Sequence, residues 1–80
     1  DFDRALLAAK AVCTSPDATR SYRLQGCQRA GLLAQWHRRD DELARRMFEL
    51  GCEGDGAEDS KLDASFRETS CAHALRLHKE

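Results

Sequence analysis

Apolar side chains recur every three or four residues in four stretches of the chain, which is the spacing of an amphipathic α-helix. The first helix is expected to run from about Phe2 to Val12. The second should follow Ser15 and Pro16, which suit a helix cap and the first helical position, and should end near Trp36. The packing residues assigned to these two helices are Leu6, Leu7, Ala9, Val12, Tyr22, Leu24, Cys27, Ala30, Gly31, Leu33, Ala34 and Trp36.

The two later helices have clearer start signals. Asp40 is expected to cap the third helix, and Ser60 with Asp63 resembles a capping arrangement for the fourth. The turn before Asp40 is short, so the second and third helices should be antiparallel neighbours. The segment from Glu53 to Ser60, rich in glycine and acids, is expected to be a mobile loop. No strand pattern appears, and the sequence predicts an all-α fold of four antiparallel helices.

The chain also repeats itself. Residues 1–13 can be laid over residues 40–52 so that the closing cysteines coincide, and residues 26–30 match residues 70–74 in the same way. A period of about 40 residues with two helical segments is typical of stacked αα-hairpin repeats. We therefore expect a single domain over residues 1–80, made of a half repeat at 1–13, a repeat at about 16–53 and a half repeat at about 60–80.

The cysteines are expected to cross-link this small domain. A chain of 80 residues buries only about 60% of its unfolded surface, so extra stabilisation is usually needed. Four cysteines allow three disulfide connectivities, and the one that fits the internal repeat pairs Cys13 with Cys27 and Cys52 with Cys71. Persistent disulfides imply an oxidising compartment. A periplasmic or secreted location is favoured, and the mitochondrial intermembrane space is possible.

Two groups of residues resemble a known family. The first is Ala44, Phe48 and Cys52 on one helix, and the second is Cys27, Ala30, Gly31 and Ala34 on another. The resemblance that they carry is to the cysteine-rich branch of the Sel1-like repeats, relatives of the tetratricopeptide repeats. The resemblance implies stacked, disulfide-stapled αα-hairpins in which a cysteine ending one repeat is bridged to a cysteine in the first helix of the next. It implies the same bridges, Cys13–Cys27 and Cys52–Cys71. A free-standing disulfide-bonded four-helix domain without any repeat relationship is the structural alternative.

Charge and hydropathy narrow the classes of partner. The net charge is −1, which lacks the basic excess expected of a nucleic-acid-binding protein. The arginines of the basic cluster Arg38, Arg39, Arg45 and Arg46 are expected to be offset by Asp40, Asp41 and Glu42. No apolar run approaches the roughly 20 residues of a membrane-spanning helix. We therefore expect neither nucleic-acid binding nor membrane insertion.

Residues that could carry chemistry are few. His37, His73 and His78, with the four thiols, could in principle bind a metal, but the close Cys-x-x-Cys and His-x-x-x-His spacings of zinc sites are absent. His73 and His78 are expected at the solvent edge of the fourth helix. The serines lack a nucleophile elbow or a base partner. We expect no enzyme activity, no cofactor and no resident metal.

A binding surface remains the main functional expectation. In αα-repeat stacks, the first helix of each repeat lines a concave face that binds proteins or peptides. The polar residues expected on that face are Arg20, Arg23, Gln28, Arg67, His73 and Arg76. The sequence thus predicts a non-enzymatic protein–protein interaction or scaffold module. The alternatives are a small secreted helical protein, such as a toxin, inhibitor or signalling ligand, and a metal- or haem-binding accessory protein; the polar face can also be an ordinary hydrated surface.

Overall fold

The structure, a computed structural model, describes residues 1–53 and 60–77. This part of the chain contains four helices and no strand, which confirms the all-α prediction. The helices are α1 (Phe2–Thr14), α2 (Arg20–Trp36), α3 (Asp41–Cys52) and α4 (Lys61–Leu77). Most of the predicted mobile loop and the last residues, including His78, lie outside the described residues.

Capping side chains set the helix starts. The Asp40 carboxylate accepts a hydrogen bond from the Leu43 amide at 3.0 Å, and the Ser60 hydroxyl accepts one from the Asp63 amide at 3.1 Å. Each cap satisfies an amide that has no partner within its own helix. Both predicted starts are confirmed.

The predicted start of α2 is wrong. α1 continues to Thr14, so Ser15 and Pro16 lie in the turn that links the two helices. Thr19 is the cap instead, because its hydroxyl accepts a hydrogen bond from the Tyr22 amide at 3.2 Å. A threonine hydroxyl serves this purpose nearly as well as a serine hydroxyl, and only Thr19 follows the completed turn.

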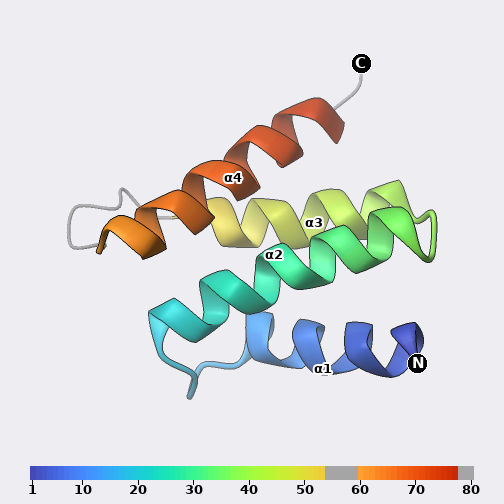
Figure 1. Ribbon diagram of the computed structural model, residues 1–80, viewed down its shortest axis with the longest axis horizontal. Coiled ribbons are helices and arrows are strands. Elements are labelled where there is room, and N and C mark those ends of the chain that lie inside the picture. Colours follow the sequence, from blue (N-terminus) through green and yellow to red (C-terminus); the bar gives the residue numbers. More distant parts are fainter. Residues whose placement is uncertain (54–59, 78–80) are drawn as a thin grey trace.

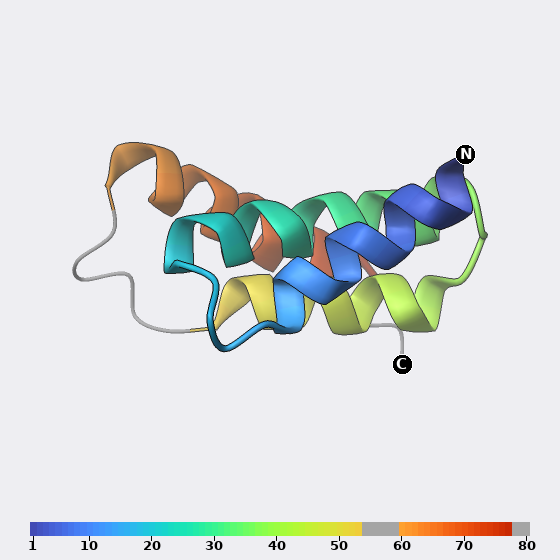
Figure 2. The ribbon, with the colours of Figure 1, turned by 90° about the horizontal axis from the view of Figure 1, so that it is seen from below.

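The helices lie side by side in chain order. α1 packs on α2, α2 on α3 and α3 on α4, while α2 also touches α4 (Figure 1). α1 and α4 therefore form the two outer edges of a slab that measures 33 × 31 × 18 Å. Figure 2, viewed from the α1 edge, shows α1 in front of α2 and α3.

The core is centred on the contact between α2 and α3. Met47 and Phe48 of α3 are the largest fully buried side chains there. α2 brings small residues to the same place: a Cβ atom at Gly31 would lie 2.6 Å from the Phe48 ring. The close approach of α2 therefore depends on the missing side chain at Gly31.

Two disulfides link the helices in pairs. Cys13–Cys27 joins α1 to α2 with a Cα–Cα distance of 4.5 Å, and Cys52–Cys71 joins α3 to α4 at 4.8 Å. The predicted pairing is confirmed. Two disulfides are consistent with an oxidising compartment.

Several residues assigned to the core are at the surface. Leu7, Tyr22 and Trp36 are 68%, 65% and 67% exposed. On α4, the apolar side chains of Leu62 and Leu75 are also exposed. The helical pattern identifies which face of a helix is apolar, but burial also requires a neighbouring element on that face. Among the described residues, the edge helices α1 and α4 lack a neighbour on one side.

Candidate protein interface

An apolar groove of about 710 Å³ lies over α1 and α2. Its α1 wall consists of Ala5, Ala8, Ala9 and Val12, which are spaced as one stripe of a helix. Ala9 is buried, Val12 is half-buried, and Ala5 and Ala8 are exposed. Apolar side chains that packing would normally cover thus remain open along α1.

The opposite wall comes from α2 and from one residue of α4. Tyr22, Gln28, Arg29 and Leu32 of α2 line it, and Phe66 of α4 contributes an aromatic side chain. Arg29 is the charged residue among the described lining residues, and it makes no hydrogen bond or ion pair within the described part of the chain. The described lining of the groove is therefore mainly apolar and includes aromatic side chains, and Arg29 is the cation within it that has no partner among the described residues.

Arg20 and Arg23 lie elsewhere. They line a smaller cavity of about 220 Å³ beside the Cys13–Cys27 disulfide. The Arg20 guanidinium donates to the Glu53 carbonyl oxygen at 3.3 Å, and the Arg23 guanidinium donates to the Ala18 carbonyl oxygen. Both arginines therefore bind main-chain oxygens around the disulfide rather than line the groove.

His73 belongs to the contact between α3 and α4. Its ring stacks on Phe48 with a centroid distance of 4.7 Å and an interplanar angle of 20°. Burial, and secondarily the nearby positive charge of Arg76, lower the pKa of His73 below its usual 6.5. His73 is half-buried on α4, and the apolar part of its imidazole covers Phe48.

The six predicted binding residues do not gather on one surface. Gln28 lines the groove, Arg20 and Arg23 line the smaller cavity, and His73 packs against α3. Arg76 is exposed and Arg67 is half-buried, both on α4. Whether any of them binds a partner stays a prediction.

The sequence interpretation overlooked the alanine stripe of α1. Of its groove-lining residues, Ala9 and Val12 were assigned to the core, and Ala5 and Ala8 received no role. The internal repeat carries the missing signal, because Ala8 and Ala9 align with the large residues Met47 and Phe48. A change from large to small residues at matching positions indicates that the two stripes have different neighbours.

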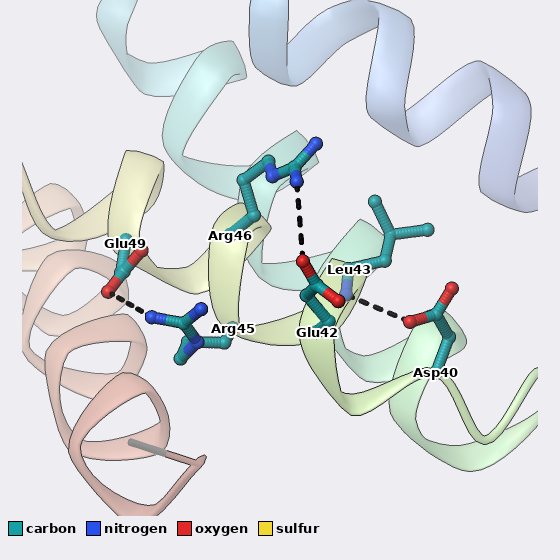
Figure 3. A network of polar contacts seen from close by, with 6 residues as sticks. All are labelled: Asp40, Glu42, Leu43, Arg45, Arg46 and Glu49. Atoms are coloured by element: carbon teal, nitrogen blue, oxygen red, sulfur yellow. Dashed lines mark hydrogen bonds and ion pairs between the residues drawn. The ribbon is translucent and has the colours of Figure 1, made fainter. Parts of the chain in front are cut away.

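The basic cluster is locally compensated. On α3, Arg46 pairs with Glu42 at 3.8 Å and Arg45 with Glu49 at 3.5 Å (Figure 3). Arg38 pairs with Asp3 of α1 at 3.0 Å. Exposed pairs of this kind contribute at most about 1 kcal/mol each to folding stability. Three of the four arginines of the cluster thus have an acidic partner; no ion pair of Arg39 is seen among the described residues.

Other kinds of site find little support in residues 1–53 and 60–77. No group of three or more His, Cys, Asp or Glu residues in this part is placed to hold a metal ion. None of its helices is both long enough and apolar enough to cross a membrane. Comparison with protein-family models, curated proteins and solved structures finds no match. The groove is thus the feature from which a function can be argued.

Proposed function

We propose that this chain is a non-enzymatic protein–protein interaction module of the Sel1-like, tetratricopeptide-like type that works in an oxidising compartment, periplasmic or secreted. Its helices are taken as αα-hairpins with antiparallel neighbours, each pair stapled by one disulfide. The disulfides at the cysteines matched by the internal repeat support this arrangement. The apolar groove over α1 and α2 carries the functional part of the proposal.

The lining of the groove favours binding over catalysis. Burial of apolar surface contributes roughly 25 cal/mol per Å², and the exposed Ala5, Ala8 and Tyr22 offer such surface. Tyrosine is also enriched among the residues that dominate binding energies at protein interfaces. The described lining residues include neither a carboxylate nor a histidine to act as a general base. Covering the groove with a partner would therefore lower the free energy of the system.

Two alanines of α1 provide the test. Ala8 and Ala11 are both exposed, but only Ala8 is among the described residues that line the groove. Ala8→Arg should weaken partner binding by at least about tenfold, roughly 1.4 kcal/mol, because it places a charge on the apolar wall. Ala11→Arg is the matched control and should leave binding unchanged, since arginine is also a good helix former.

The measurement is chemical cross-linking of the purified, oxidised protein in the secreted or periplasmic fraction of its source. Mass spectrometry then identifies the proteins linked to each variant. A defined partner that is lost with Ala8→Arg and kept with Ala11→Arg supports the proposal. Equal capture by both variants would show that the groove is not the binding surface.

A further inference from the structure

The internal repeat shows what covers the groove-lining stripe when it is covered. The alignment that places Cys13 on Cys52 also places the four α1 groove residues on four residues of α3, and those four are the buried residues of α3. The aligned pairs are Ala5 with Ala44, Ala8 with Met47, Ala9 with Phe48, and Val12 with Gly51.

Helices cover the α3 stripe from both sides. α2 approaches Phe48 through Gly31, and α4 approaches it through His73. For α1, the disulfide partner α2 takes the place that α4 has beside α3, but no described helix takes the place that α2 has beside α3. Its disulfide partner α2 covers part of the stripe, because Gly26 lies against Val12. Of the other described helices, α3 touches α1 only slightly, and α4 reaches the groove through Phe66 alone. The groove is therefore the space over α1 and α2 that no described helix fills, and at the matching stripe of α3 a second helix is present.

The sizes of the aligned side chains on α3 and α1 indicate what kind of helix would fill the groove. At the contact of α3 with α2, the large Phe48 of α3 meets Gly31 of α2, and the buried core around them also contains the large Met47 and the small Ala30. α1 brings alanines at the aligned positions. A helix with small residues would therefore leave voids along α1, and interiors tolerate voids poorly. The complementary helix must bring large apolar side chains.

The charge of Arg29 indicates one more property of the helix that would fill the groove. Arg29 lines the groove, is exposed, and has no partner among the described residues. An acidic side chain on the flank of a bound helix can pair with it through charge-assisted hydrogen bonds. We infer that the groove takes one amphipathic α-helix of a partner protein, with large apolar side chains toward α1 and an acidic residue toward Arg29. This inference rests on the proposed function and specifies the partner.

Synthetic helical peptides test the inference on the full, oxidised chain. The main probe is a peptide of about five turns with leucines spaced i, i+3, i+4 and i+7, glutamates on its flanks and lactam staples that keep it helical. A second peptide has alanines at the four leucine positions. A third keeps the leucines but carries lysines in place of the glutamates. Binding is measured by fluorescence anisotropy and by chemical-shift changes at the α1 alanines.

The leucine–glutamate peptide should bind at least about tenfold more tightly than the other two. Ala8→Arg should abolish its binding, and Ala11→Arg should not affect it. Arg29→Gln should weaken binding of the glutamate peptide and remove its advantage over the lysine peptide. That advantage should also shrink as salt is raised, since exposed charges are screened.

Three results would overturn the inference. In the first, the alanine-faced peptide binds as tightly as the leucine-faced one. In the second, no peptide binds, although Ala8→Arg still abolishes cross-linking to a natural partner; the proposed function then stands and the helical occupant is wrong. In the third, sedimentation shows a dimer that Ala8→Arg dissociates, and the groove is then covered by a second copy. Loss of both peptide binding and Ala8-dependent cross-linking would remove the proposed function as well.

Discussion

The two disulfide-linked helix pairs share one plan but differ in their surroundings. In the α1–α2 pair both cysteines are buried, with Cys13 5% and Cys27 2% exposed, whereas Cys52 and Cys71 of the α3–α4 pair are half-buried. The stripe on α3 is covered on both sides, and the matching stripe on α1 is open. Similar local sequence therefore ends in different burial, because the number of neighbouring helices differs.

The residue before each cysteine shows how the pairs achieve the same close approach. In the first pair, Val12 of α1 faces Gly26 of α2; in the second, Gly51 of α3 faces Ser70 of α4. Each contact has one glycine, but on opposite helices. Helices joined by a disulfide at this position do not have room for two full side chains, and either helix can supply the glycine.

Removal of either disulfide should have the largest effect on the free energy of unfolding, and the two costs should differ. Losing a native disulfide from a small domain typically costs about 2–5 kcal/mol. Replacing Cys13 and Cys27 with alanine should cost more than replacing Cys52 and Cys71, because the first pair also leaves a cavity in the core. The Cys52–Cys71 disulfide closes a longer loop, 19 against 14 residues. The longer loop raises the cost of removing this disulfide by only about 0.3 kcal/mol.

Urea unfolding followed by far-ultraviolet circular dichroism measures both costs. Limited reduction with trapping of free thiols provides an independent measurement, in which the more accessible Cys52–Cys71 bond should open first. A larger cost for the Cys52/Cys71 replacement would show that burial of the sulfur atoms is not what separates the two pairs.

The sequence predicted the parts of the fold that depend on local chemistry or on the internal repeat. The helices, the caps at Asp40 and Ser60, and the pairing of Cys13 with Cys27 all follow from residue types and their spacing. The start of α2 was missed, because two adjacent segments offered a capping hydroxyl and only the length of α1 decided between them.

The candidate interface was harder to predict, since it depends on which neighbours are present. Leu7 and Tyr22 have the spacing of core residues, and no local signal distinguishes a covered apolar face from an open one. The polar residues proposed for binding were expected on one face, but the structure distributes them over the groove, the smaller cavity, the contact between α3 and α4, and other positions on α4. A comparison of aligned repeat positions would have identified the α1 stripe, because alanine there replaces the large residues of α3.

The two glycine contacts should respond differently to an added methyl group, with an intermediate effect on stability. A Cβ at Gly26 would lie 3.0 Å from two backbone atoms, the Ala9 carbonyl oxygen and the Cys13 nitrogen. The three atoms nearest to a Cβ at Gly51 would all be side-chain atoms, the closest being the Ser70 hydroxyl oxygen at 2.7 Å. Overpacking costs about 1–3 kcal/mol, and Gly26→Ala should lie at the upper end because backbone atoms yield less.

Ser70 provides the control for this contact. Its hydroxyl is fully buried and has no hydrogen-bond partner among the described residues, so Ser70→Ala alone should be neutral or slightly stabilising. In the Gly51→Ala background, Ser70→Ala should recover part of the lost stability, and in the Gly26→Ala background it should recover none. Chemical denaturation of the single and double variants gives the two coupling energies. Equal recovery in both backgrounds would contradict the proposed steric origin.

The smallest expected effect is a pH dependence confined to the α3–α4 pair. In the alignment of α2 with α4, His73 matches Arg29, so only the α3–α4 pair has a histidine at this position. The pKa of His73 is lowered in the folded state by burial and by Arg76, so below its ordinary value of 6.5 the unfolded chain binds more protons than the folded chain. Stability should be complete above about pH 6.5 and should decline as the pH falls through the lower folded-state pKa.

His73→Phe isolates this contribution, because phenylalanine keeps an aromatic ring against Phe48 without a titrating group. Wild type should lose stability as the pH falls below about 6.5, and the variant should lose measurably less over the same range. Because every other titrating group is present in both proteins, the difference between them reports on His73. Arg29→Gln, the matched change in the first pair, should leave the pH profile as it is in wild type. If His73→Phe and wild type decline in parallel, protonation of His73 does not weaken the contact, and the two helix pairs do not differ in their response to acid.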